Sequence, residues 1–266
     1  MRLCLVSLDQ VWLDKVANFE RCRNFVSKAS HSFCDVIVFP EMTLTGYSMN
    51  SHEISEPIQT SDTLSWFADL SFQYNINIVF GAVLSEKSSP LPFNTMCLAS
   101  PNCSSKIIYR KIHPFSYSGE DLCFSAGSNL EVFHIEGTRI LPSICYDLRF
   151  PELFSLASSF TDMSLVIANW PKSRIGHWFT LLQARAIENQ CFLVGVNRVG
   201  SDGNGLSYDK SSLIVSPTGD VLSPELTSHE FDIYDINIDD VLNYRSQFPT
   251  LKDRKPFLYR VISQSF

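Results

Sequence analysis

An apolar segment that ends on a cysteine constrains the fold of this chain more than any other feature. Residues 139–144 have the pattern of a buried strand, Cys145 follows directly, and Pro151 then marks a helix start in a polar segment. A strand that turns into a helix at a nucleophilic residue exposes that residue at the rim of an α/β scaffold. The backbone N–H groups after it point outward, where they can bind an oxyanion.

Two more predicted strands end on residues with matching chemistry. The apolar run 35–40 leads into Glu41, and the run 106–110 leads into Lys111. A carboxylate directly after an apolar strand is costly unless it is paired or used. A carboxylate, an ammonium and a thiol at three strand ends suit acyl transfer from an amide. Glu41 would act as general base, and Lys111 with the Tyr146 N–H would hold the oxyanion.

Each of these residues has an ordinary alternative. Cys145 could be a buried structural thiol, Glu41 a salt-bridged carboxylate and Lys111 a solvated lysine. A free thiol has a pKa near 8.5 and needs a neighbouring cation or base to become reactive; Glu41 and Lys111 would supply both. His113 shares a strand face with Lys111, but the sequence shows no Asn or Asp partner that would orient it. We therefore interpret Cys145 as the nucleophile and His113 as structural.

The sequence around these residues resembles the carbon–nitrogen hydrolase (nitrilase) superfamily, and its omega-amidase branch in particular. The likeness is carried by residues 145–152, 168–171, 177–178, 184–190 and 197–205. It implies a four-layer α-β-β-α sandwich and a Glu-Lys-Cys triad. It also implies that Glu120 is a second glutamate beside the triad, which orients Lys111 and the incoming amide.

The order of predicted elements is compatible with that α/β fold class. Strands are predicted over residues 1–8, 35–40, 77–84, 94–99, 105–110, 130–135, 138–145, 164–169, 191–197, 211–216 and 230–236, and helices over 12–29, 62–73, 151–159, 176–189 and 238–245. Many strands and few helices favour two packed sheets over one doubly wound sheet, although periodicity alone does not decide. No linker or repeat divides the chain, so residues 1–266 are predicted to form one domain.

Composition and charge exclude several classes of function. The 266 residues carry a net charge of −7, which speaks against nucleic-acid binding but not against an anionic substrate, since a pocket needs only one or two cations. No apolar run reaches the ~20 residues of a membrane helix, and Asp9 interrupts the apolar N-terminus. We expect a cytoplasmic protein without membrane contact.

Neither a metal nor a cofactor is indicated. The eight cysteines are dispersed, which in a large leaderless chain indicates reduced thiols. Zinc motifs of the Cys-x-x-Cys or His-Glu-x-x-His type do not occur. The glycine-containing turn 200–205 lacks the Gly-Lys-Ser/Thr ending of a phosphate loop. We therefore expect catalysis without a cofactor.

A substrate that carries a carboxylate needs a cation in the pocket. Arg174, in the loop after Trp170, is the first candidate, and Arg198 is the second, with a surface or interlayer salt bridge as the alternative for each. Arg149 and Arg185 are expected to form structural ion pairs. Trp170 could form a wall of the pocket or belong to the core.

These features predict an amidase that hydrolyses the ω-amide of short 2-oxo dicarboxylic acids, such as 2-oxoglutaramate and 2-oxosuccinamate, through a cysteine thioester. The alternatives are another carbon–nitrogen hydrolase acting on aliphatic amides or N-carbamoyl amines, and an inactive binding protein on the same fold. A thiol redox sensor would need a resolving cysteine near Cys145, and none is near it in sequence.

A homodimer is also predicted. Charged residues make up only 18 % of the chain, below the usual quarter, and the C-terminal segment 238–266 contains apolar residues between Phe248 and Tyr259. The resemblance implies pairing across the face that carries the helix after Cys145.

Overall fold

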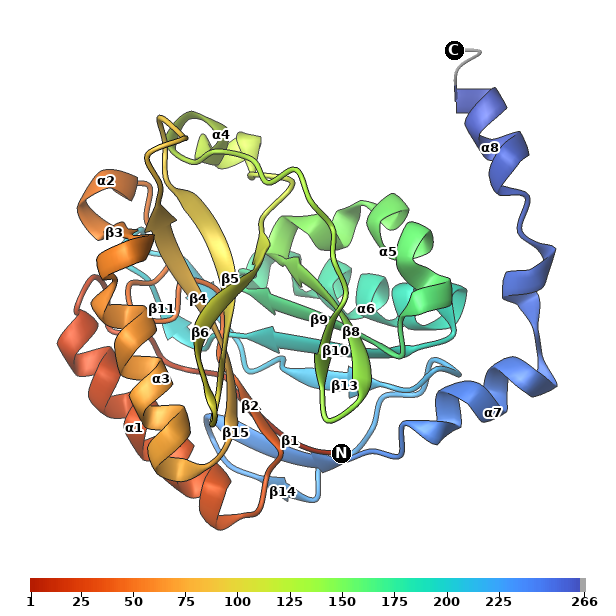
Figure 1. Ribbon diagram of the computed structural model, residues 1–266, viewed down its shortest axis with the longest axis horizontal. Coiled ribbons are helices and arrows are strands. Elements are labelled where there is room, and N and C mark those ends of the chain that lie inside the picture. The colour runs from red at the N-terminus through yellow and green to blue at the C-terminus, as the bar shows by residue number, and fades with distance from the viewer. Residues whose placement is uncertain (264–266) are drawn as a thin grey trace.

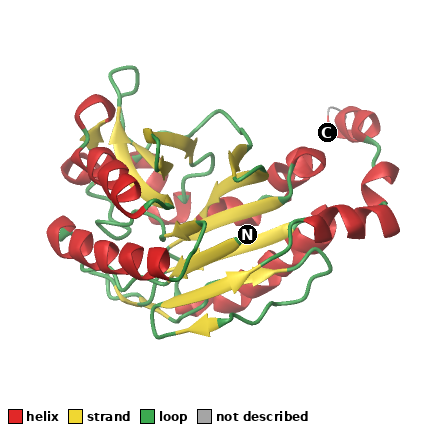
Figure 2. Ribbon diagram, turned by 60° about the horizontal axis from the view of Figure 1, so that its bottom comes forward, coloured by secondary structure: helices red, strands yellow, loops and turns green. Residues whose placement is uncertain are grey.

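The computed structural model describes residues 1–263 as two β-sheets packed face to face with helices on their outer faces (Figures 1 and 2). The predicted four-layer α-β-β-α sandwich is confirmed. Residues 264–266, the end of the predicted domain and of the predicted dimer segment, lie outside the described residues.

The first sheet has the strand order β14-β15-β1-β2-β4-β5-β6, and β3 pairs with β4. Its strands are β1 (Arg2–Val6), β2 (Val36–Val38), β3 (Glu56–Pro57), β4 (Asn77–Ser85), β5 (Phe93–Ser100), β6 (Cys103–Arg110), β14 (Leu226–Thr227) and β15 (Phe231–Asp235).

The second sheet has the order β13-β10-β9-β8-β7, and β11 and β12 form a separate ribbon. These strands are β7 (Phe133–Ile135), β8 (Thr138–Ile144), β9 (Met163–Ala168), β10 (Phe192–Asn197), β11 (Gly200–Ser201), β12 (Ser207–Tyr208) and β13 (Leu213–Val215).

The helices are α1 (Lys15–His31), α2 (Ser51–Ile54), α3 (Asp62–Tyr74), α4 (Glu120–Cys123), α5 (Pro151–Ala157), α6 (Ile175–Asn189), α7 (Asp239–Gln247) and α8 (Pro256–Ser263). Short 3₁₀ segments include η2 (Ser116–Ser118), η3 (Cys145–Arg149), η4 (Ser158–Phe160), η5 (Lys172–Arg174) and η6 (Thr250–Asp253). Helix α1 begins later than the predicted residue 12, because the Asp14 side chain caps it by accepting from the Ala17 N–H at 2.9 Å.

Three apolar layers separate the four layers of secondary structure. Side chains of both sheets, such as Leu5, Val38 and Ile167, meet in the middle layer. On the outer face of the first sheet, Ile37 and its neighbours pack against α1 and α3, whereas on the second sheet Val166 and its neighbours pack against α5 and α6. Because side chains alternate across a strand, each central strand supplies both an inner and an outer layer, which explains why these strands are apolar throughout.

The strand directions bring the predicted site residues to one edge of the sandwich. Strands β1, β2 and β4 are parallel, and β6 regains their direction after two antiparallel pairings. In the second sheet, β8, β9 and β10 are also parallel. The chain therefore leaves β2 towards Glu41, β6 towards Lys111 and β8 towards Cys145 at carboxyl ends of strands, where ligands bind in α/β proteins.

The C-terminal helices leave the body of the sandwich as an arm. Figure 1 shows α7 running outward from the sheets and α8 standing away from them. Arg245 on α7 anchors the arm by donating to the carbonyls of Ser158, Thr161 and Asn189. Among residues 1–263, no helix combines the length and apolarity needed to cross a membrane.

Gly81 allows β4 to approach the turn that follows β2. A Cβ at this position would lie 2.4 Å from the Met42 backbone N and 2.9 Å from the Glu41 Cα. The Gly81 N–H also donates to Thr43 Oγ1 at 2.9 Å. Two backbones in such contact leave no room for a methyl group.

We expect Gly81→Ala to displace the Glu41 turn and to lower the free energy of unfolding by about 1–3 kcal/mol, the usual cost of overpacking. Urea unfolding followed by circular dichroism measures this change. Gly176→Ala is the control, because a Cβ there meets nothing within 4 Å. Equal stability of both variants would contradict the packing argument.

Candidate active site

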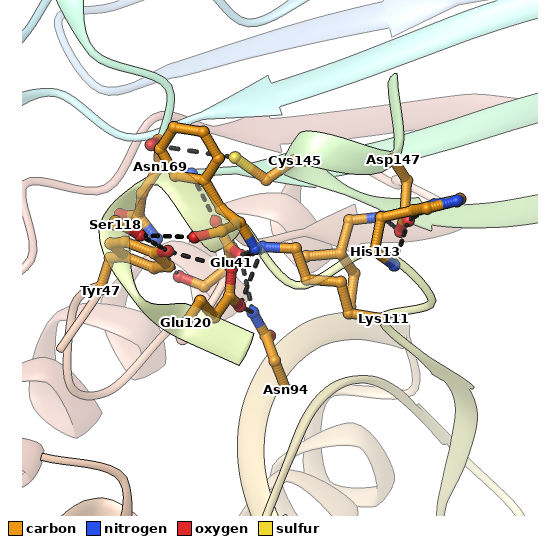
Figure 3. Close-up of polar contacts among 12 residues, drawn as sticks. Glu41, Tyr47, Asn94, Lys111, His113, Ser118, Glu120, Cys145, Asp147 and Asn169 are labelled. Atoms are coloured by element: carbon orange, nitrogen blue, oxygen red, sulfur yellow. Dashed lines mark hydrogen bonds and ion pairs between the residues drawn. The ribbon is translucent and has the colours of Figure 1, made fainter. Parts of the chain in front are cut away.

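A buried ion cluster forms the floor of the site (Figure 3). The Lys111 Nζ lies 3.0 Å from Glu41 Oε1 and 2.8 Å from Glu120 Oε2, and all three side chains are at most 1 % exposed. Glu120 also accepts from the Tyr47 hydroxyl at 3.0 Å and from the Phe115 N–H at 2.6 Å. The structure thus brings Glu41, Lys111 and Glu120 together although they lie on three separate segments.

Two asparagines fix the orientation of the Glu41 carboxylate. Asn94 Nδ2 donates to Glu41 Oε1 at 2.7 Å and to Glu120 Oε1 at 3.0 Å. The Asn169 N–H donates to Glu41 Oε2 at 2.9 Å, and the Asn169 amide donates to the Glu41 carbonyl at 2.8 Å. Asn169 follows β9, so the second sheet holds a side chain of the first.

The charges in the cluster stabilise one another. Burial lowers the pKa of Lys111, but the negative charges of Glu120 and Glu41 more than offset this, and its pKa lies well above the ordinary value. Burial raises the pKa of Glu120, but the charge and hydrogen bonds of Lys111 outweigh it, so that pKa lies below its usual value. Lys111 and Glu120 are therefore both charged at neutral pH.

Cys145 stands where β8 turns into η3, beside this cluster (Figure 3). Its backbone φ is +47°, which is unusual for a residue with a side chain and fits a sharp strand-to-helix turn. Its Sγ lies 4.0 Å from the Asn169 carbonyl oxygen. The side chain is partly exposed and forms part of a cavity wall.

The surroundings of Cys145 determine the protonation state of its thiol. Burial, reinforced by the negative charge of Glu41, raises the pKa of Cys145 well above its ordinary value, and the opposing charge of Lys111 does not offset it. Lys111 and Glu41 therefore do not create a standing thiolate. The resting residue is a thiol, and a base must remove its proton during attack.

Asp147 ties the Cys145 turn to the segment that follows Lys111. This fully buried carboxylate accepts from the Ile144 N–H at 3.0 Å, the Tyr109 hydroxyl at 2.9 Å and the His113 N–H at 3.0 Å. Its Oδ1 also lies 2.8 Å from His113 Nδ1. His113 thus has the acidic partner that the sequence did not reveal, and it is part of this bracing network rather than of the cavity wall.

The cavity above Cys145 is lined by aromatic and basic residues: Tyr47, Phe115, Ser118, Cys145, Tyr146, Arg149, Asn169, Trp170, Pro171, Arg174, Leu206 and Tyr208. Of the predicted substrate-binding residues, Tyr146, Trp170 and Arg174 belong to this lining. The Trp170 indole N–H donates to the Arg174 carbonyl at 2.8 Å, which fixes the loop that carries Arg174.

The structure does not bring Arg198 to the cavity, which corrects its assignment as a substrate ligand. Its side chain is fully buried and donates to the carbonyls of Val199, Gln10 and Ser201. Its NH2 group lies 3.6 Å from Asp9 Oδ1. The guanidinium therefore connects the loops that follow β1 and β10. This agrees with the alternative prediction, in which Arg198 forms an interlayer salt bridge.

The chain is similar over its whole length to known carbon–nitrogen hydrolases. The family model for carbon–nitrogen hydrolase matches residues 2–245. The omega-amidase YafV of Yersinia enterocolitica is 34 % identical over 259 residues, which cover 97 % of this chain and 98 % of the relative. The chain belongs to the carbon–nitrogen hydrolase family.

Further relatives agree with this assignment. The 2-oxoglutaramate amidase of Bacillus subtilis (strain 168) is 33 % identical, with 91 % of this chain and 93 % of the relative covered. The crystal structure of XC1258 from Xanthomonas campestris, a CN-hydrolase superfamily protein with an arsenic adduct in the active site, superposes with a TM-score of 0.88 at 29 % identity. That match covers 96 % of this chain and 97 % of the other. The chain is a hydrolase of amide C–N bonds, of the omega-amidase-like branch.

Sequence reasoning on this carbon–nitrogen hydrolase missed Asn94, Asn169 and Asp147. Asn169 and Asp147 lie within runs that resemble the family, so a search for polar residues just after strands would have found them. Asn94 opens β5 and has no motif around it. Only the pairing of β5 with β4 and β6 places its side chain between the two glutamates.

We expect Glu120→Gln to lower the free energy of unfolding by about 3–5 kcal/mol at pH 7, because it leaves Lys111 with one buried counter-ion fewer. The folded-state pKa of Glu120 is lowered, so its contribution is complete above the unfolded pKa of about 4.3 and is lost as pH falls through the folded value. The difference from the wild type should therefore narrow below about pH 4.

Urea unfolding at pH 7, 4 and 3 tests this dependence, since the narrowing is expected only at the acidic end of that range. Glu53→Gln, at an exposed glutamate in α2, is the matched control and should change stability little at any of these pH values. A Glu120→Gln difference that stays constant with pH, or is absent at pH 7, would show that the pairing is not stabilising.

Proposed function

We propose that this protein is a cytoplasmic amidase that hydrolyses the ω-amide of short 2-oxo dicarboxylic acids, such as 2-oxoglutaramate and 2-oxosuccinamate, to the 2-oxo acid and ammonia. One observation carries the proposal: the Arg174 guanidinium lines the same cavity as Cys145 and has no carboxylate partner among residues 1–263. A guanidinium held in a cavity with an amide-cleaving set matches a substrate with an amide at one end and a carboxylate at the other. The names of the relatives support this substrate class.

In the first half of the proposed reaction, Cys145 Sγ attacks the amide carbon while Glu41 takes the thiol proton. The raised pKa of Cys145 fits this coupling, because the thiol loses its proton only as the C–S bond forms. The oxyanion is held by Lys111 Nζ and the Tyr146 N–H. The Tyr146 N–H lies in the first turn of η3, where an N–H has no partner within the helix.

The tetrahedral intermediate then collapses to a thioester. Glu41 gives its proton to the leaving nitrogen, the C–N bond breaks and ammonia departs. Glu41 next removes a proton from a water that attacks the thioester carbon. As the C–S bond breaks, Glu41 returns this proton to Cys145 Sγ, so that the acid and the free thiol are released. Glu120 and Asn94 keep Lys111 and Glu41 in place throughout, since both bond to the cluster from the side away from Cys145.

In this proposal Arg174 binds the carboxylate of the substrate. Its guanidinium carbon lies 5.5 Å from the Phe115 ring centroid, so the cation is held over an aromatic face. A charge pair in a partly desolvated pocket contributes far more to the binding free energy than an exposed pair, which contributes at most about 1 kcal/mol.

The test is ammonia release from a panel of amides. Wild-type protein should turn over 2-oxo dicarboxylate monoamides fastest, and Cys145→Ala should be inactive on all of them. Arg174→Gln should lower kcat/KM for the charged amides by roughly 100-fold and leave an uncharged short amide such as propionamide nearly unchanged.

Lys172→Gln is the matched control, because Lys172 lies on the same η5 segment but pairs with exposed Asp209. Equal losses on charged and uncharged amides would mean that Arg174 supports the scaffold. Faster wild-type turnover of aliphatic amides or N-carbamoyl amines would assign the protein to another substrate class of the family.

We also propose that the protein is a homodimer whose contact includes α5 and the C-terminal arm. On α8, Phe257 is 80 % exposed, and on α5 and η4, Leu156 and Phe160 are 74 % and 66 % exposed. Helix α8 stands away from the two sheets (Figure 1), although it is strongly amphipathic. A second copy would bury these side chains and would brace the helix that follows Cys145.

Light scattering at micromolar concentration should give twice the monomer mass. Phe257→Ser combined with Tyr259→Ser should shift the protein towards the monomer. Phe72→Ser, at an equally exposed phenylalanine on α3, should not. A wild-type monomer with full activity would overturn this proposal.

A further inference from the structure

Arg149 lines the cavity together with Arg174, although the sequence predicted it to be a structural ion pair. It ends η3, the same short segment that begins with Cys145. Its guanidinium carbon lies 4.8 Å from the Trp170 ring centroid. Its one side-chain polar contact among residues 1–263 is with His177 Nδ1 at 3.3 Å.

The contrast with Arg185 shows what a structural arginine looks like in this protein. Arg185 was predicted to be an ion pair as well, and it donates to Glu188 Oε1 at 3.0 Å and to the Leu148 carbonyl at 3.0 Å. Arg149 donates to no oxygen of a described residue. Its N–H groups are therefore available to a ligand in the cavity.

The cavity has a charge opposite to that of the whole protein. The chain carries a net charge of −7, yet the cavity-lining residues include two arginines and no acidic side chain within the described residues. Aromatic rings hold both cations: Trp170 holds Arg149, and Phe115 holds Arg174. Rings restrict where a guanidinium can lie but offer no oxygen acceptor, so both guanidinium groups are oriented and neither donates to an oxygen of a described residue.

A single substrate carboxylate binds one of these two guanidinium groups. The proposed substrate has one further strong acceptor at that end, the 2-oxo oxygen next to the carboxylate. We propose that Arg149 is a specificity-determining residue that donates to this 2-oxo oxygen while Arg174 binds the carboxylate; this assignment rests on the proposed function. A 2-amino analogue would instead place an ammonium beside the Arg149 cation, so the same residue disfavours amino-acid amides by charge repulsion.

Three four-carbon monoamides test the proposal, because they differ only at carbon 2. 2-Oxosuccinamate carries the oxo group, succinamate carries two hydrogens, and asparagine carries an ammonium. The wild type should show kcat/KM falling in that order. A hydrogen bond from a charged donor corresponds to about a tenfold to 100-fold preference for the 2-oxo compound over succinamate.

Arg149→Gln should bring the ratio of kcat/KM for 2-oxosuccinamate and succinamate close to one, mainly through loss on the 2-oxo compound. It should also shrink the discrimination against asparagine. Arg149→Lys should retain the discrimination against asparagine, since it keeps the charge, and should lose part of the 2-oxo preference, since it lacks the fork. Arg23→Gln, on the outer face of α1 and 3.9 Å from Glu20, is the control that should change none of these ratios.

Binding to the Cys145→Ala protein gives a second readout. Calorimetry should show that Arg149→Gln, in the Cys145→Ala background, weakens 2-oxosuccinamate binding by at least tenfold and leaves succinamate binding within about threefold. Thermal unfolding of each variant identifies any that fail to fold, in which case the Arg149→Lys ratios decide.

The measurements distinguish failure of the Arg149 proposal from failure of the proposed function. Equal losses on all three amides after Arg149→Gln would make Arg149 a scaffold residue and overturn the proposal. Loss of the 2-oxo preference after Arg174→Gln but not after Arg149→Gln would overturn it too. A wild type that hydrolyses none of the three, but does hydrolyse uncharged amides, would instead refute the proposed function.

Discussion

The ammonium of Lys111 between two carboxylates is the interaction on which the rest of the site depends. Glu41 and Glu120 are fully buried, and charges in such a place are tolerated only when each has a partner of opposite sign and further hydrogen bonds. Asn94 donates to Glu41 Oε1 and Glu120 Oε1, which Lys111 also contacts, and the Asn169 N–H donates to Glu41 Oε2, which Lys111 leaves free. Removal of any one member leaves a buried charge without its partner, which lowers the free energy of unfolding. The cluster is therefore both a structural joint between the sheets and a preset electrostatic environment.

That environment determines how the thiol can react. Two negative charges and one positive charge surround Cys145, and burial adds to the same effect, so the raised pKa keeps the sulfur protonated. A permanently ionised cysteine would be vulnerable to oxidation and would add a third negative charge beside Glu41 and Glu120. Coupling deprotonation to attack avoids both, because the new negative charge develops on the substrate oxygen, within reach of the proposed oxyanion donors.

The cavity next to Cys145 has a charge distribution of its own, different from that of the buried cluster. Two carboxylates and one lysine lie beside Cys145 outside the cavity lining, whereas the cavity walls hold Arg149 and Arg174 over aromatic rings. In the proposed function, the anionic end of the substrate meets these arginines and its neutral amide faces the buried cluster. Asp147 fixes the position of the cavity relative to the buried cluster, because it accepts hydrogen bonds from both the Cys145 turn and the segment after Lys111.

The sequence by itself determined where the central strands end and which candidate residues follow them, and its resemblance to a family implied the four layers. Strands that are apolar on both faces, such as β8 and β10, must be covered on both sides, and a charged residue directly after such a strand must lie at an edge. This information lies in short-range sequence pattern, from which Glu41, Lys111 and Cys145 were identified as candidates.

Only the tertiary structure decided which polar side chains meet. Asn94 reaches Glu41 through strand pairing across 53 positions of sequence, and His113 finds Asp147 across 34. The arginines show the same limit: a guanidinium within a motif can face a carbonyl, a carboxylate or a cavity, and local sequence does not encode that choice. Arg198 is buried among carbonyl groups, whereas Arg149 has no oxygen acceptor among residues 1–263, because packing between loops of different strands determines what surrounds each one.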